Sequence, residues 1–172
     1  MPGFHVSHAL LDNGARVVGL DNFNDYYSPK LKRDRDKELR KFKNFVPIQG
    51  DLADLPTLEA LFERYRPEKI FHLAAQAGVR YSLINPFAYQ QANLEGFLNI
   101  LEMARKLPVE RLVYAFSSSV YGGLTELPFA ETQRVDTPIS LYAATKKANE
   151  LMAHSYSHLF GLATVGLRSF LF

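Results

Sequence analysis

The sequence contains no cysteine among its 172 residues, and it also lacks any long apolar run. Without cysteine, the chain can form neither disulfide bonds nor thiolate metal sites. No apolar run approaches the roughly 18 residues that span a bilayer, and the N-terminus lacks the basic and apolar regions of a secretory signal. We therefore expect a soluble, intracellular protein with the cytoplasm as its compartment.

The sequence also has little net charge, with 20 Lys and Arg residues against 18 Asp and Glu residues, a formal charge of +2. Such a small excess does not favour binding to nucleic acid or to an anionic membrane. Residues 30–43 are the most charged stretch, but both signs alternate there, which predicts a solvated surface helix. His154 and His158 have helical spacing but no third ligand, so we expect no metal site. The length suits one domain.

Short β-branched runs alternate with longer segments of helical periodicity along the chain. We predict helices over residues 4–12, 30–43, 55–65, 85–104 and 141–159. We predict strands over residues 16–20, 45–48, 69–75, 111–116 and 163–167. This alternation is typical of parallel βαβ units with right-handed crossovers. The sequence therefore predicts an α/β fold with a doubly wound parallel sheet and helices on both faces.

Tyr142 and Lys146 lie four residues apart at the start of a predicted helix, about 25 residues after a serine-rich strand end. On a helix this spacing places both side chains on one face, so the ammonium can lie near the phenol. A nearby Lys⁺, together with a positively charged nicotinamide, favours the phenolate and lowers a pKa that is ordinarily near 10. The tyrosinate can then take a proton from a sugar hydroxyl as the carbon loses hydride. Ser117, at the strand end, can hydrogen-bond the same hydroxyl.

Asp21 directly follows the strand predicted over residues 16–20. A carboxylate at this point of a dinucleotide-binding fold accepts hydrogen bonds from the adenosine ribose and repels a 2′-phosphate, which favours NAD over NADP. The alternative is a turn or helix cap. Asp51 and Leu52, after the next strand, suit an adenine contact. The small side chains of residues 74 and 75 would let a cofactor pass close to the backbone.

Five stretches together carry a likeness that extends over nearly the whole chain. They are VVGLDNFNDYY (17–27), HLAAQAGVRYSLINP (72–86), ANLEGFLNILE (92–102), SSSVYG (117–122) and SLYAATKKANELMAHSYSHLFGL (140–162). They resemble the extended short-chain dehydrogenases/reductases of the NAD-dependent epimerase/dehydratase family, and within it the UDP-glucuronate 4-epimerases. The resemblance implies a Rossmann-like fold, NAD as the cofactor and a UDP-sugar as the substrate.

The resemblance also implies roles for individual residues. Ser117, Tyr142 and Lys146 would form the catalytic triad, and Lys146 would also hold the nicotinamide ribose. The residues that would line the cofactor are Gly3, Asp21, Asn22, Asp51, Leu52, Ala74, Ala75 and Asn93. Those that would face the substrate are Gln76, Arg80 and Ser118. A surface ion pair is an alternative role for Arg80. In relatives, the helices corresponding to residues 88–106 and 142–160 pair across a two-fold axis, which implies a homodimer.

The implied reaction is the 4-epimerisation of UDP-glucuronate to UDP-galacturonate through a 4-keto intermediate. Tyr142 would deprotonate the 4-hydroxyl while hydride leaves C4 for NAD⁺, and the hydride would return to the other face of the sugar. Dehydratases of the family carry an Asp-Glu pair where this sequence has Ser118 and Ser119, so dehydration is disfavoured. A UDP-glucuronate decarboxylase, a UDP-glucose 4-epimerase and a non-catalytic remnant that binds a partner are the alternatives.

Both ends of the sequence depart from the family pattern. The family opens with a strand and a glycine-rich loop, whereas this chain starts at what would be the last glycine of that loop, Gly3. The strand would be central in the order 3-2-1-4-5-6, so residues 16–20 and 69–75 should face a gap with unpaired edges. At the other end, Leu171 stands in place of a threonine. We expect an incomplete NAD-binding domain over residues 1–172, with weak or no epimerase activity by itself.

Overall fold

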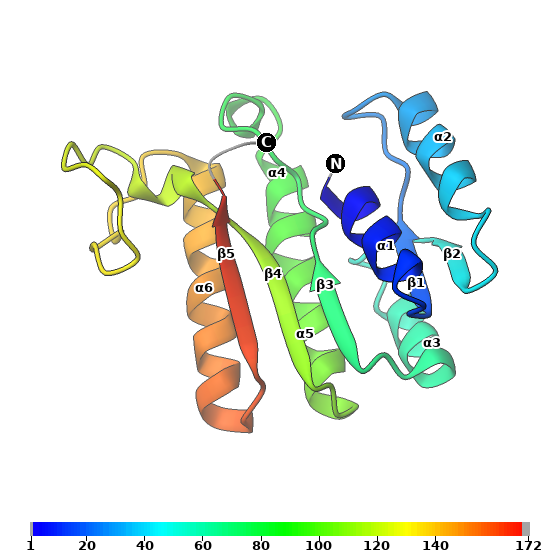
Figure 1. Ribbon diagram of the computed structural model, residues 1–172. Coiled ribbons are helices and arrows are strands. Elements are labelled where there is room, and N and C mark those ends of the chain that lie inside the picture. Colours follow the sequence, from blue (N-terminus) through cyan, green and yellow to red (C-terminus); the bar gives the residue numbers. More distant parts are fainter. Residues whose placement is uncertain (1, 170–172) are drawn as a thin grey trace.

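The computed structural model describes residues 2–169, which form an α/β fold of parallel strands and helices (Figure 1). The strands are β1 (Val17–Asp21), β2 (Phe45–Gln49), β3 (Lys69–His72), β4 (Arg111–Ser117) and β5 (Thr164–Ser169). The helices are α1 (Pro2–Asp12), α2 (Pro29–Leu39), α3 (Leu55–Tyr65), α4 (Pro86–Tyr89), α5 (Gly96–Lys106) and α6 (Leu141–Phe160). The predicted alternation of strands and helices is confirmed. Leu171 lies outside the described residues.

The strands form two separate parallel sheets. One has the order β1-β2 and the other has the order β3-β4-β5. Within the described part of the chain, β1 and β3 form no ladder with each other, so the predicted gap between these strands is confirmed. Figure 1 shows the two sheets next to one another, with α1 in front of the region between them. β3 ends at His72, three residues before the predicted end, and the following residues leave the sheet.

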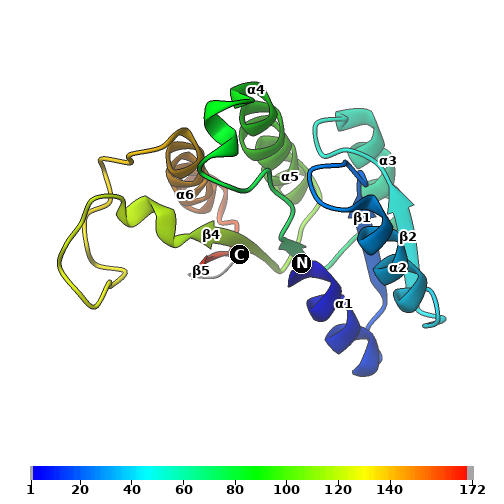
Figure 2. The ribbon, with the colours of Figure 1, turned by 90° about the horizontal axis from the view of Figure 1, so that it is seen from above.

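Helices lie on both sides of the strands, as Figure 2 shows, with α3, α4, α5 and α6 on one side and α1 on the other. The main core lies beneath α5 and α6, where β4 buries Leu112, Tyr114 and Phe116. Alternate residues of a strand point to opposite faces. On the opposite face of this sheet, Phe71 and Leu167 are 41% and 51% exposed. The sheet β3-β4-β5 is therefore covered much better on its α5 and α6 side.

The long helical stretch predicted over residues 85–104 contains an interruption. After α4, residues Gln90–Glu95 form a π-helical segment, and α5 continues the helix from Gly96. Such wide turns within helices often lie at functional sites, because they free a backbone carbonyl and rotate side chains out of the regular helical positions. Here the π-helical segment directs Asn93, which is 1% exposed, towards the interior.

Gly166 on β5 gives a direct test of the packing between the sheet and its core. A Cβ atom at this position would lie 2.7 Å from the Tyr114 ring, which is itself in the core. Because an inserted methyl group forces a packed neighbour to move, we expect Gly166→Ala to lower the free energy of unfolding by about 1–3 kcal/mol. Urea unfolding measures the change. Gly123→Ala is the control, since no atom lies within 4 Å of its added Cβ, and equal losses in both variants would contradict this packing.

Candidate functional site

The carboxyl ends of the parallel strands lie at one edge of the molecule, where the loops after β1, β3 and β4 meet (Figure 1). In parallel α/β sheets, ligands bind at this edge. The N-terminal end of α1, which carries Gly3, lies at the same edge (Figure 1). The predicted site residues lie at the carboxyl ends of β1 and β4, in the loops after β1, β2 and β3, or on adjoining helical segments. The parallel topology therefore brings segments that are distant in sequence to one site.

Ser117, Tyr142 and Lys146 are brought together beside the end of β4, and all three are at least nine-tenths buried. Ser117 is the last residue of β4, and its hydroxyl lies near enough to the Tyr142 phenol to lower the pKa of that group. The Lys146 ammonium donates to the backbone carbonyl of Ala115 at 3.1 Å, two residues before Ser117 on the same strand. Ser140 caps the N-terminus of α6 and thereby fixes the start of the helix that carries both Tyr142 and Lys146.

Lys146 by itself does not lower the pKa of Tyr142 in this structure, and the predicted effect of Lys146 together with a positively charged nicotinamide stays a prediction. Burial raises the pKa of Tyr142 above its usual value of 10, and the nearby Ser117 hydroxyl opposes this increase only in part. The charge of Lys146 acts on His72 instead, whose pKa falls to about 3 mainly because of burial. The phenol of Tyr142 is therefore protonated at neutral pH in this structure, because low-dielectric surroundings disfavour the phenolate.

Burial of Lys146 predicts a specific pH dependence of stability. Burial lowers the pKa of Lys146 from 10.5 to about 8, so the unfolded chain binds this proton more tightly than the folded chain. The contribution of this group to the free energy of unfolding therefore rises with pH from about 8 to about 10.5. Between pH 8 and pH 10, we expect the wild-type protein to gain about 2 kcal/mol relative to Lys146→Met.

Urea unfolding of both proteins across this pH range measures the difference. Lys147→Met is the matched control, because it removes the neighbouring ammonium, which pairs with Asp136 and Glu150 nearer the surface. The control should keep the rise between pH 8 and pH 10. A wild-type advantage over Lys146→Met that stays constant across this range would contradict the buried charge.

A buried amide network links the segments on both sides of the triad. The Asn93 side chain accepts from the Gln76 amide at 2.8 Å, and donates to the Gln76 carbonyl at 3.0 Å and to Thr145 at 3.1 Å. Asn149 donates to the backbone carbonyl of Asn93 at 2.6 Å. This bond satisfies a carbonyl within the π-helical segment, where the regular helical bonding is altered. The network therefore ties the loop after β3 and the π-helical segment to α6.

The residues predicted to hold the adenosine end lie at the ends of β1 and β2. Asp21 accepts from the Phe23 amide at 2.7 Å, and the same oxygen lies 3.8 Å from the ammonium of Lys32. Lys32 is buried on a helix that is otherwise mostly charged and exposed or half-buried, so no local pattern distinguishes it from the other lysines there. Asn22 donates to Asp51 at 2.8 Å and so joins the loops that follow the two strands.

The remaining predicted cofactor residues lie at the same edge. The carbonyl of Leu52 accepts from Asn99 at 2.9 Å, which holds the turn after β2 against α5. Ala74 and Ala75 follow β3 in a loop, not in the strand as predicted. Gly3 lies in α1, with no atom within 4 Å of where a Cβ would stand. The structure therefore leaves space around Gly3.

The predicted substrate residues have different surroundings. Gln76 is 6% exposed, and its side-chain nitrogen is a buried donor with no hydrogen-bond partner in the structure. Such a donor is expected to receive a partner when a ligand binds. Arg80 is exposed and forms no ion pair with any residue in the range 2–169. Ser118 helps to line a cavity of about 270 Å³ that also contacts Ser119, Ile139 and Ser140.

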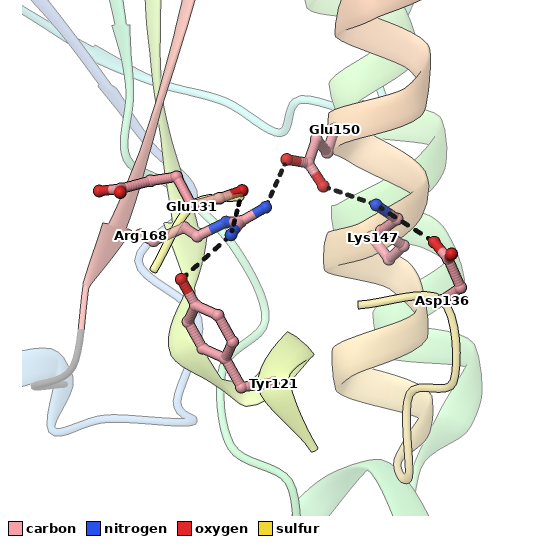
Figure 3. Close-up of polar contacts among 6 residues, drawn as sticks. All are labelled: Tyr121, Glu131, Asp136, Lys147, Glu150 and Arg168. Carbon is pink, nitrogen blue, oxygen red and sulfur yellow. Dashed lines mark hydrogen bonds and ion pairs between the residues drawn. The ribbon is translucent and has the colours of Figure 1, made fainter. Parts of the chain in front are cut away.

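A charged network holds α6 against β5 on the other side of the triad (Figure 3). The guanidinium of Arg168 donates to the Tyr121 hydroxyl at 3.0 Å and to Glu150 at 2.8 Å. Lys147 in turn lies 3.0 Å from Glu150 and 3.9 Å from Asp136. Because Lys147 directly follows Lys146 and Glu150 lies one turn after Lys146, this network fixes the helix that carries Tyr142 and Lys146.

Residues 2–169 contain neither a cluster of metal ligands nor a membrane-spanning helix. No group of three or more His, Cys, Asp or Glu side chains lies close enough together to hold a metal ion. None of the helices in this range combines the length and the apolar character that crossing a membrane requires.

Comparisons with known proteins agree with this arrangement. The family model described as GDP-mannose 4,6 dehydratase matches residues 2–171. UDP-glucuronate 4-epimerase 3 of Arabidopsis thaliana is 52% identical over 169 residues, which are 98% of this chain and 39% of that protein. Protein CapI of Staphylococcus aureus is 50% identical over 98% of this chain and 50% of its own length. The chain thus spans half or less of the length of these two relatives.

Solved structures give the same result. The UDP-glucuronic acid 4-epimerase of Bacillus cereus, solved with UDP-glucuronic acid and NAD, has a TM-score of 0.86 and 30% identity, covering 96% of this chain and 52% of that chain. The Thermus thermophilus UDP-glucose 4-epimerase, solved with NAD, has a TM-score of 0.85 and 35% identity. The match covers 98% of this chain and 51% of that chain. The chain therefore belongs to the NAD-dependent epimerase/dehydratase family of extended short-chain dehydrogenases/reductases, which that family model represents.

Proposed function

We propose that this protein acts in the NAD-dependent 4-epimerisation of a UDP-hexuronic acid, converting UDP-glucuronate to UDP-galacturonate through a 4-keto sugar. The observation that carries the proposal is the meeting of Ser117, Tyr142 and Lys146 at the carboxyl end of β4. The identity of 50% or more to UDP-glucuronate 4-epimerases of Arabidopsis thaliana supports the choice of substrate class.

The described residues fit NAD as the cofactor. Both contacts of the Asp21 carboxylate involve the same oxygen, which leaves its second oxygen for a ribose hydroxyl. The Gln76 side-chain nitrogen is a buried donor without a hydrogen bond of normal geometry, and a ligand can supply its partner. Lys146 would hold the nicotinamide ribose, and Asn93 would fix the surrounding loop. The bound nicotinamide supplies a reversible acceptor for the hydride of the sugar C4.

The protein's own groups handle the proton of the sugar 4-hydroxyl. Tyr142 takes this proton as C4 is oxidised and returns it when C4 is reduced on the other face. Ser117 hydrogen-bonds the same hydroxyl and the Tyr142 phenol, which orients the oxygen for proton transfer. Lys146 lies buried beside β4, where its positive charge, together with that of a bound nicotinamide, would favour the phenolate during the reaction. Gln76, Arg80 and Ser118 face the substrate, and Arg80 provides an exposed cation for its anionic groups.

The serines after the strand end argue against dehydration. In dehydratases of the family an acid and a base follow the triad serine or threonine, whereas here Ser118 and Ser119 occupy these positions. The Ser117 hydroxyl donates to the Ser119 hydroxyl at 3.0 Å and accepts from the Ser119 amide at 3.1 Å. Neither serine can protonate or deprotonate a carbon at neutral pH. Epimerisation therefore fits this site better than loss of water.

A homodimer through α5 and α6 completes the proposal. These helices carry exposed apolar side chains, including Leu98, Leu151 and Leu159, which are 41%, 55% and 67% exposed. Exposed apolar side chains that recur along adjoining helices are typical of a subunit interface. Packing this surface against the same surface of a second copy would remove the exposed apolar side chains of both chains from water.

The proposal is tested in two steps with the purified chain. Titration calorimetry with NAD and light scattering give the cofactor affinity and the oligomeric state. Incubation with NAD and UDP-glucuronate, followed by NMR of the products, then separates galacturonate from a decarboxylated pentose, and UDP-glucose is tested in parallel. We expect NAD binding, a dimer and UDP-galacturonate that forms slowly, since the chain is expected to be an incomplete NAD-binding domain with weak activity. A dimer with no affinity for NAD would contradict the proposal and favour a partner-binding protein.

A further inference from the structure

Four tyrosine rings from four separate segments form a continuous group beside the triad, which we call the tyrosine cluster. Its members are Tyr26 after β1, Tyr81 in the loop after β3, Tyr89 on α4 and Tyr142 on α6. The ring centroids of Tyr26 and Tyr81 are 4.8 Å apart, those of Tyr81 and Tyr89 are 6.2 Å apart, and those of Tyr89 and Tyr142 are 6.0 Å apart. The cluster therefore connects the loop after β1 to the proposed base.

Tyr89 is the central member of this cluster. It is 0% exposed, and its ring meets that of Tyr142 edge-on at an interplanar angle of 73°. This is a favoured geometry for aromatic pairs, because the positive edge of one ring faces the negative surface of the other. A rigid ring in this position restricts the movement of the Tyr142 ring.

The hydroxyl of Tyr89 has a second function in the same place. It donates to the carbonyls of Ala77 and Gly78, at 2.7 Å and 2.5 Å. Gly78 has a φ angle of +97°, a conformation that side chains disfavour, and the Tyr26 hydroxyl lies against the position where a Cβ would stand. Tyr89 thereby holds the turn that directly follows Gln76, whose side-chain nitrogen has no partner.

We propose that Tyr89 is a positioning residue, which orients the Tyr142 phenol through its ring and fixes the turn at residues 77 and 78 through its hydroxyl. The proton transfer itself stays with Tyr142 and Ser117. A phenol displaced by even 1 Å from its acceptor loses much of its catalytic effect, since proton transfer requires hydrogen-bond distance. The inference rests on the proposed function for its kinetic consequence, but the geometry of the Tyr142 ring can be tested without turnover.

The test compares Tyr89→Leu, which removes ring and hydroxyl, with Tyr89→Phe, which keeps the ring and removes the hydroxyl. Labelling of tyrosine with ¹³C at Cζ allows the phenols to be titrated by NMR, and Tyr142→Phe identifies the resonance of Tyr142. We expect Tyr89→Leu to lower the pKa of Tyr142 by about one unit, because loss of the covering ring admits water. We expect kcat for UDP-glucuronate to fall about 10- to 100-fold, with KM changed less than about two-fold.

Tyr89→Phe should leave the pKa of Tyr142 unchanged, while the amide resonances of residues 77–79 move and kcat falls about 5- to 10-fold. Tyr156→Phe is the matched control, because it removes a buried hydrogen bond to Glu102 near the far end of α6. It should change neither the Tyr142 titration nor kcat. Tyr89→Phe and Tyr156→Phe are matched because each loses one hydroxyl, whereas Tyr89→Leu also loses a fully buried ring and should lose the most stability.

The outcomes separate the two proposals. If Tyr89→Leu keeps the wild-type pKa of Tyr142 and the wild-type kcat while losing stability, Tyr89 is a core residue only and the inference is wrong. If Tyr89→Leu fails to fold, Tyr89→Phe decides, and unmoved amides at residues 77–79 together with an unchanged kcat overturn the inference. If the wild-type chain shows no turnover, the proposed function fails, while the titration of Tyr142 still tests the positioning.

Discussion

Tyr142→Phe should reduce the rate of UDP-glucuronate epimerisation by about 10³-fold relative to the wild-type chain, the scale of effect expected for a general base. The substitution removes only the phenol oxygen, so the ring keeps its edge contact with Tyr89 and its buried position on α6. Neither Ser117 nor Lys146 can replace the lost oxygen, because the serine has no strong basicity and the ammonium faces a backbone carbonyl. NMR of the sugar products over time measures the rate.

The affinity for NAD, measured by calorimetry, should change little in Tyr142→Phe, because the proposed cofactor contacts lie on other residues. Tyr156→Phe is the control, since it removes a tyrosine hydroxyl from the same helix at a position far from the site. Retention of more than a tenth of the wild-type rate in Tyr142→Phe would exclude this tyrosine as the base. A loss of NAD binding in the same variant would instead indicate that the phenol holds the cofactor.

Asn93→Leu should lower the free energy of unfolding by about 3–5 kcal/mol, because it leaves more than one buried polar group without a partner. Leucine has a similar volume, so the effect comes from the lost hydrogen bonds rather than from a cavity. The amide and the carbonyl of Gln76 would both lose their bonds to the Asn93 side chain. The Thr145 hydroxyl would keep its hydrogen bond to the Tyr142 carbonyl but lose the hydrogen bond from the Asn93 side-chain amide.

Urea unfolding followed by circular dichroism measures this loss. Asn99→Leu is the matched control on α5, because its side chain makes one bond, to the Leu52 carbonyl, and is only partly buried. We expect this control to lose about 1 kcal/mol, the usual net contribution of a single hydrogen bond. Equal losses in the two variants would show that the buried network around Asn93 contributes no more than a peripheral contact.

Local signals in the sequence were sufficient for several elements. α3 spans Leu55–Tyr65, as predicted, because Asp54 caps its first turn and Arg66 ends it in a left-handed conformation. α6 begins after the Ser140 cap and ends at Phe160, one residue after the predicted end, with Gly161 as its left-handed cap. Caps act through hydrogen bonds within one helical turn, so their effect can be read from neighbouring residues. The same reasoning placed Tyr142 and Lys146 on one face of a helix.

Other features depend on contacts that no local pattern encodes. The π-helical segment depends on the bond that Asn149 makes to the Asn93 carbonyl, between residues 56 positions apart. The early end of β3 and the buried position of Lys32 also depend on which segments pack beside them. Thr145 and Asn149 lie on the same face of α6 as Tyr142, at helical spacing. This spacing of polar residues could have identified the hydrogen-bond network around Asn93.

The sequence by itself determined the order of strands and helices, the family and the set of residues gathered at the carboxyl edge. These follow from short-range periodicity, caps and the direction of parallel strands. Only the tertiary structure decided that burial raises the pKa of Tyr142, that Gln76 keeps an unpartnered donor and that Tyr89 lies between Tyr142 and its neighbouring loop. The physical reason is that desolvation and ring contacts depend on every segment around a group, and those segments meet only in the folded chain.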